Sequence, residues 1–144
     1  MTSLSGDSER KLDRAALVLR VVLGAVFVAH GYQKLFGMGI PGATTMFTQI
    51  GAPMPALTAP AVAVLEFAGG LALFVGAFTR VAAILLACDM LGAMIFVHAK
   101  NGFFAPKGIE LTLGNFAMLI AIAVLGAGVY SLDAMMAKRG AHTP

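Results

Sequence analysis

Charged residues are scarce in this chain of 144 residues: they make up 12% of it, whereas hydrophobic residues make up 59%. A soluble globular domain carries about 25% charged residues. The composition therefore excludes an ordinary soluble core and indicates a protein surrounded by lipid. The length is that of one domain, so we expect residues 1–144 to form a single integral membrane domain.

Tryptophan is absent and Cys88 is the single cysteine. No tryptophan belt marks the membrane interfaces. One thiol cannot form an internal disulfide or a C-x-x-C pair, which excludes thiol–disulfide chemistry within one chain. The sequence also lacks a metal-spaced ligand cluster, a nucleotide-binding loop and a nucleophile triad. We therefore expect no metal site and no covalently bound cofactor.

Four apolar runs of about 20 residues are long enough to cross a bilayer as helices. They predict an all-α, polytopic membrane protein, a bundle of four transmembrane helices. Residues 1–9, in the first of two short polar tails, are expected to be disordered. The predicted helices span about 15–36, 57–78, 80–99 and 111–130, with tails over 1–13 and 131–144.

A short interfacial helix is expected between the first two spans. The stretch ATTMFTQIG in the connection over 37–60 places Met46, Phe47 and Ile50 toward lipid. The second and third spans are joined at Thr79-Arg80 by so short a turn that they must be antiparallel neighbours.

The basic residues read as topology determinants rather than as a nucleic-acid surface. With four spans, seven of the ten Lys and Arg residues fall on one side and three on the other. The positive-inside rule then places both termini on the cytoplasmic side of a bacterial inner membrane. The seven are Arg10, Lys11, Arg14, Arg20, Arg80, Lys138 and Arg139, and the three are Lys34, Lys100 and Lys107.

A weak internal repeat links the two halves of the chain. Leu23-Gly24-Ala25 followed by His30 matches Leu91-Gly92-Ala93 followed by His98, and Glu66-Phe67-Ala68 matches Asn115-Phe116-Ala117. The two halves would be helical hairpins related as parallel repeats about an axis along the membrane normal.

Polar groups inside the spans fall into two layers when depth is counted at about 1.5 Å per residue. His30, Glu66 and Asn115 share a level in the outer half, and Arg20 and Asp89 share one in the inner half. An acid inside a membrane helix is costly and marks a functional site by default. Arg20 and Asp89 are interpreted as a structural ion pair.

The outer layer is the candidate ligand site. Glu66 and His30 are the candidates for proton exchange, since a histidine–carboxylate pair suits it, although a catalytic role stays open. Lys34 and Asn115 would orient a carbonyl group of the ligand, and His98, where the chain leaves the membrane, is a further candidate contact. In the alternative reading, Glu66 is a structural acid that is hydrogen-bonded to a neighbouring helix.

Two histidines on different helices raise the question of haem. Ligation by two histidines needs both rings on one axis. His98 is expected at the membrane interface and lies roughly opposite Asp89 on its helix, so the pattern argues against haem held by His30 and His98.

A series of short motifs runs along most of the chain. In order they are Arg20-x3-Gly24 with Phe27, Gly31 and Lys34-Leu35; Glu66-x2-Gly69-Gly70; Gly76-x2-Thr79-Arg80; His98 before Asn101-Gly102-Phe103-Phe104; Glu110; and Gly126-x-Gly128-x-Tyr130-Ser131-Leu132-Asp133. Taken together, these motifs make the chain similar to the DoxX family of small four-helix membrane proteins, over about residues 14–133. The outer loop departs from the family pattern, with Lys107-Gly108-Ile109-Glu110 where similar proteins often have Gly-Gly-x-Glu.

The resemblance implies a role in membrane redox chemistry. The related DoxD protein is a subunit of a thiosulfate:quinone oxidoreductase. Other members are described as quinol-oxidase-like subunits or as membrane anchors linked to oxidative and sulfur stress defence. The family supplies no established catalytic residues, so the candidate residues rest on the physical argument alone.

Three functional hypotheses follow. The first is a membrane subunit that binds a quinone or another small redox-active ligand in its outer half, beside a protein partner that carries the redox centre. The second is a scaffold without a ligand, whose polar groups join the helices. The third is a small transporter or proton conductor. A homo-oligomer is also compatible, because four short helices offer little interior.

Overall fold

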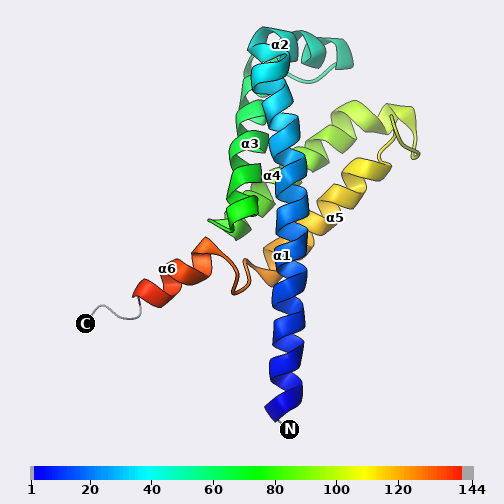
Figure 1. Cartoon of the computed structure of the whole chain (residues 1–144). Helices are drawn as coiled ribbons and strands as arrows, with labels where there is room; N and C mark the ends of the chain where they lie inside the picture. Colours follow the sequence, from blue (N-terminus) through cyan, green and yellow to red (C-terminus); the bar gives the residue numbers. More distant parts are fainter. Residues whose placement is uncertain (1, 141–144) are drawn as a thin grey trace.

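The computed structural model describes residues 2–140, with side chains from residue 6 onward, as helices and connecting loops. The predicted all-α class is confirmed, since this part of the chain has no strand. In order, the helices are α1 (Thr2–Tyr32), η1 (Gln33–Gly37), α2 (Gly39–Ile50), α3 (Pro55–Val75), α4 (Thr79–Ala93), η2 (Met94–His98), η3 (Ala99–Asn101), α5 (Glu110–Leu125) and α6 (Leu132–Gly140) (Figure 1).

The first helix begins earlier than the sequence predicts. α1 starts at Thr2 and has 31 residues. At 1.5 Å per residue this is about 46 Å, more than the roughly 30 Å of a bilayer's hydrocarbon core. The expectation of disorder is therefore wrong for residues 2–9, which continue the helix beyond the bundle (Figure 1). An ion pair of 3.0 Å between Lys11 and Asp7, spaced i,i+4, supports this extension.

Glycines let the backbones of α1 and α3 touch. A Cβ atom on Gly24 would lie 2.8 Å from the Gly70 carbonyl oxygen, and one on Gly70 would lie 2.6 Å from the Val28 nitrogen. A Cβ on Gly31 would overlap the backbone of Phe67. Such small residues permit close approach between membrane helices. The pairing of α1 with α3 therefore depends on these glycines.

The second helix pair is α4 with α5, and α3 joins the two pairs. α3 ends at Val75 and is capped by Gly76, whose φ of +73° suits a glycine, and α4 begins at Thr79. The predicted antiparallel contact across this short turn is confirmed. The core between the pairs contains side chains that are at most 2% exposed: Leu23, Phe27, Leu73, Leu86, Leu119 and Ile122.

The predicted interfacial helix exists as α2, but its apolar face does not point to lipid. Phe47 is 9% exposed and packs with Ala43 and with Ala59 of α3. Met46 and Ile50 are partly buried against the same cluster. α2 therefore covers the beginning of α3, because its apolar side chains find a protein partner there.

Two helical stretches are long and apolar enough to cross a membrane among the residues described, Pro55–Val75 and Thr79–Asn101. Glu110–Leu125 is apolar but shorter. The count of four spans therefore stays a prediction, with α1 and α5 as the further two.

The internal repeat also stays a prediction. Both halves form helix pairs, yet Gly24 is packed against α3, whereas a Cβ on the corresponding Gly92 would meet nothing within 4 Å. The two halves therefore pair their helices through different contacts.

The C-terminal segment, predicted as a polar tail over 131–144, contains α6. This helix leaves the bundle at the end where α3 stops and α4 starts (Figure 1). We call that end the Arg20 end and the opposite one, at η1, the Lys34 end. Residues 141–144 lie outside the described part of the chain.

Replacing Gly31 with alanine tests the contact between α1 and α3. We expect Gly31→Ala to destabilise the bundle by about 1–3 kcal/mol, because the added methyl group overlaps Phe67. Gly92→Ala is the matched control, and it should be neutral or stabilising by up to about 1 kcal/mol, since alanine favours helices. The fraction that stays monodisperse on gel filtration after heating measures both. Equal behaviour of the two variants would contradict the assigned contact.

Candidate functional site

A buried ion pair joins η1 to α3. The Lys34 ammonium donates a hydrogen bond of 2.5 Å to Oε2 of Glu66, and the two residues are 9% and 5% exposed. Lys34 lies in the π-helical segment that continues α1. Such segments are frequent at functional sites.

The local packing places this pair. Gly31, one turn before Lys34, lies against the backbone of Phe67, the residue that follows Glu66. The ring of Phe67 contacts Phe36 edge-on, with centroids 5.8 Å apart. The helices are therefore close enough at this level for a lysine on one to reach a carboxylate on the other.

Asp89 brings a third ionisable group from α4. Its Oδ2 atom is buried and has no hydrogen-bond partner. Leu86, one turn before Asp89 on α4, packs against Gly69, one turn after Glu66 on α3, so Asp89 and Glu66 lie at the same level of these two helices. The three residues form the Lys34–Glu66–Asp89 cluster, which draws on both helix pairs.

The predicted ion pair between Arg20 and Asp89 is wrong. Arg20 is fully buried and donates from Nη1 to the Leu73 carbonyl at 3.0 Å and from Nη2 to the Tyr130 carbonyl at 2.7 Å. Leu73 lies in the last turn of α3, where carbonyls lack helical partners and attract cations. The guanidinium group therefore binds backbone carbonyl oxygens at the Arg20 end and does not pair with the carboxylate of Asp89.

Asp133 links α6 to the start of α4 at the Arg20 end. The sequence did not predict this role. Its carboxylate accepts hydrogen bonds from the backbone N–H groups of Phe78 at 2.7 Å and Thr79 at 2.9 Å, which caps α4. Its own N–H donates to the Gly76 carbonyl. The Ser131-Leu132-Asp133 motif was visible in the sequence, but nothing there indicated that it meets the turn at Gly76.

These contacts lower the pKa of Asp133. Partial burial raises the pKa, but the hydrogen bonds from Thr79 and Phe78 and the charge of Arg20 outweigh it. The Asp133 carboxylate is therefore the stable form when α4 is folded.

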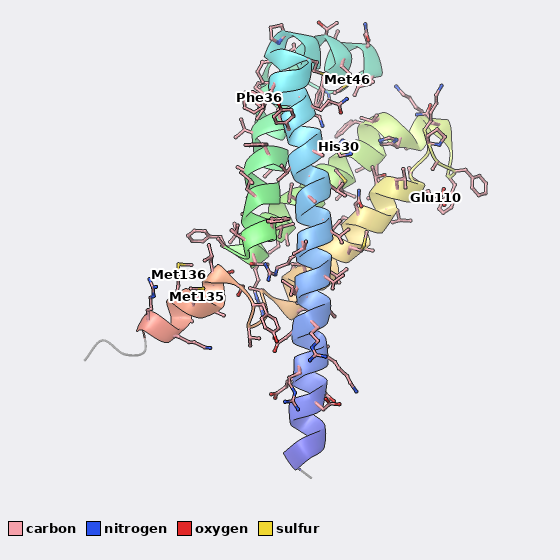
Figure 2. All side chains as sticks on the ribbon, in the orientation of Figure 1. His30, Phe36, Met46, Glu110, Met135 and Met136 are labelled. Carbon is pink, nitrogen blue, oxygen red and sulfur yellow. The ribbon has the colours of Figure 1, made fainter. Side chains whose placement is uncertain are left out.

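The other predicted ligand residues do not join the Lys34–Glu66–Asp89 cluster. His30 is exposed on the side of α1 that is turned away from α3 (Figure 2). Asn115 is half-buried on α5, and its side chain makes no hydrogen bond within residues 6–140. His98 bonds through Nδ1 to the Lys107 carbonyl at 2.7 Å and so organises the loop before α5.

A model of the DoxX family matches residues 15–99, which is more than half of the chain. The chain belongs to the DoxX family. It is 31% identical over 129 residues to "Putative oxidoreductase CatD" of Bacillus subtilis (strain 168), covering 90% of this chain and 92% of the relative. It is 30% identical over 132 residues to "Inner membrane protein YqjF" of Escherichia coli (strain K12), covering 88% of this chain and 95% of the relative.

A third relative is "Uncharacterized membrane protein Rv3486" of Mycobacterium tuberculosis (strain ATCC 25618 / H37Rv), 30% identical over 139 residues, covering 87% of this chain and 83% of the relative. No solved structure matches. The family and the apolar helices together make this chain a membrane protein. Within this DoxX protein, motifs that are distant in sequence meet at the Arg20 end, since Arg20, Gly76, Thr79 and Asp133 are all in contact there.

Single and double replacement of the buried ion pair should have opposite consequences. Lys34→Met should destabilise the protein by about 3–5 kcal/mol, because it leaves the Glu66 carboxylate buried without its partner. The double variant Lys34→Met/Glu66→Met removes both charges and should recover most of this loss. Gel filtration after heating measures both. A double variant no more stable than the single one would contradict the pairing.

The cap formed by Asp133 should make stability depend on pH. At neutral pH, Asp133→Asn should cost about 1–2 kcal/mol through loss of the charged cap. Because the folded pKa lies below the unfolded value of about 3.9, the contribution is complete above that value and disappears as pH falls through the folded pKa. Thermal stability measured across acidic pH should therefore converge for the variant and the wild type. The control is Glu9→Gln, which removes an exposed carboxylate from α1. Its thermal stability should equal that of the wild type at each pH.

Proposed function

We propose that the protein is a membrane subunit that binds a small redox-active ligand of the quinone class at the Lys34–Glu66–Asp89 cluster. One observation carries this proposal: a buried ion pair between apolar helices lies at the level of a carboxylate whose buried Oδ2 has no hydrogen-bond partner among the described residues. Ionisable groups inside membrane segments are expensive and typically serve a ligand or proton path.

The chemistry of the cluster suits a quinone. Reduction of a quinone to a quinol takes up two electrons and two protons, one at each carbonyl oxygen. The Lys34 ammonium is a hydrogen-bond donor for a carbonyl oxygen, and the carboxyl groups of Glu66 and Asp89 can exchange protons. We assign the electrons to a protein partner with a redox centre.

The proposed site keeps Lys34 and Glu66 from the site predicted by the sequence, adds Asp89, and leaves out His30, Asn115 and His98. Asp89 takes the proton-exchange role that was given to His30, because His30 is exposed while Asp89 lies at the level of Glu66. The name of the Bacillus subtilis relative, a putative oxidoreductase, agrees with a redox role.

A scaffold function is the second candidate. The observation that favours it is the completeness of the Lys34–Glu66 pair, which joins η1 to α3 with no further group required. In that case Asp89 would have no role in binding.

A measurement of quinone binding in lipid nanodiscs distinguishes the ligand-binding function from the scaffold function. We expect a short-chain quinone analogue to bind the wild type, measured by calorimetry, and Glu66→Gln and Asp89→Asn to weaken it about tenfold or more, equivalent to about 1.4 kcal/mol. Glu110→Gln, at an exposed carboxylate of the Lys34 end, is the matched control and should bind as the wild type does. Absence of binding, or an Asp89→Asn variant with unchanged affinity, would favour the scaffold.

A further inference from the structure

α6 carries an apolar surface that no other part of the described chain covers. Leu132, Met135 and Met136 are 41%, 51% and 50% exposed on this nine-residue helix. Figure 1 shows α6 to one side of α1, oblique to its axis and directed away from the bundle, and Figure 2 labels Met135 and Met136 on it. The quinone proposal makes no use of this helix.

The beginning of α6 is firmly attached. The N–H of Asp133 donates to the Gly76 carbonyl, and the Asp133 carboxylate accepts from the backbone of Phe78 and Thr79. Three hydrogen bonds thus fix the first turn of α6 on the turn between α3 and α4. The direction in which α6 leaves the bundle is therefore set by the fold.

The exposed side chains of α6 form an apolar face that ends in a basic residue. At about 100° per residue, Leu132, Met135 and Met136 share one face, and Ala137 points elsewhere. In the last turn Arg139 continues the apolar face and Lys138 flanks it, and such long side chains reach a polar surface with their charged ends. This combination of an apolar face and basic residues is typical of a helix that lies in the plane of a membrane interface.

The position of α6 selects lipid as the occupant of its apolar face. The helix starts where α3 and α5 end and α4 begins, which is the depth at which these helices leave the hydrocarbon. Its apolar face follows directly on the exposed side chains of Val129 and Tyr130, 52% and 55% exposed. A helix that leaves the bundle sideways at this depth extends along the interface, and its cations match anionic headgroups.

We propose that α6 is a membrane-surface helix, with Leu132, Met135 and Met136 at the acyl boundary and Lys138 and Arg139 on anionic lipid headgroups. The surface contact supplies a lipid-dependent anchor at the Arg20 end. It also holds Asp133, and hence the cap of α4, at a constant depth.

Spin labels measure the depth of this helix in the full-length protein. The exposed Cys88 is first replaced by alanine, and nitroxides are then placed at Met135→Cys, Met136→Cys and, as the control on another side of α6, Ala137→Cys. In nanodiscs that contain phosphatidylglycerol, the labels at 135 and 136 should collide more with oxygen than with a water-soluble nickel chelate. The label at 137 should show the reverse.

Lipid charge is tested on the same labels. Exchanging phosphatidylglycerol for phosphatidylcholine should shift positions 135 and 136 toward water, and Arg139→Gln should reduce this dependence. Arg10→Gln removes the same charge about 15 Å along α1 from Arg20 and should leave it unchanged. Nickel-accessible labels at 135 and 136 in both lipids would overturn the proposal. So would labels shielded from both reagents, which would indicate a protein or a second copy on this face.

Discussion

The close approach of α1 and α3 is the constraint on which both polar clusters depend. Gly24, Gly31 and Gly70 let the two backbones touch over several turns. Because of that contact, Lys34 reaches Glu66 at one end of the helix pair, and Arg20 reaches the Leu73 carbonyl at the other. Larger residues at the glycines would separate these partners and leave charges in an apolar environment without compensation.

The two ends of this helix pair use charge in different ways. At the Arg20 end, Arg20 and Asp133 are matched to backbone carbonyl and N–H groups at helix termini, which gives a rigid junction of α3, α4 and α6. At the Lys34 end, the charged groups of Lys34 and Glu66 pair with each other, and the carboxyl group of Asp89 has an oxygen without a hydrogen-bond partner. Both ends keep buried polar atoms without a hydrogen-bond partner among the described residues: Arg20 Nε and Thr79 Oγ1 at the Arg20 end, and Asp89 Oδ2 beside the Lys34–Glu66 pair.

The sequence located the candidate acids but paired them incorrectly in one case. Glu66 and Asp89 stand out because acids are rare in apolar helices, and the packing of Leu86 against Gly69 brings both to one level of α3 and α4. The assignment of Asp89 to Arg20 assumed straight, untilted helices of equal starting depth. Figure 1 shows α4 and α5 inclined to α1, so residues at equal counted depth do not lie at one level. His30 was grouped with Glu66 by the same arithmetic, yet its side chain is exposed.

Composition and residue order by themselves determined the helical class, the membrane setting, the DoxX resemblance and the short turn between α3 and α4, since hydrophobic run length and turn residues act locally. Tertiary structure alone decided which polar groups meet. Lys34 with Glu66, Arg20 with backbone carbonyls, and Asp133 with the first residues of α4 are contacts between distant segments. Such contacts depend on helix tilt and on the backbone approach at glycines, and local sequence specifies neither.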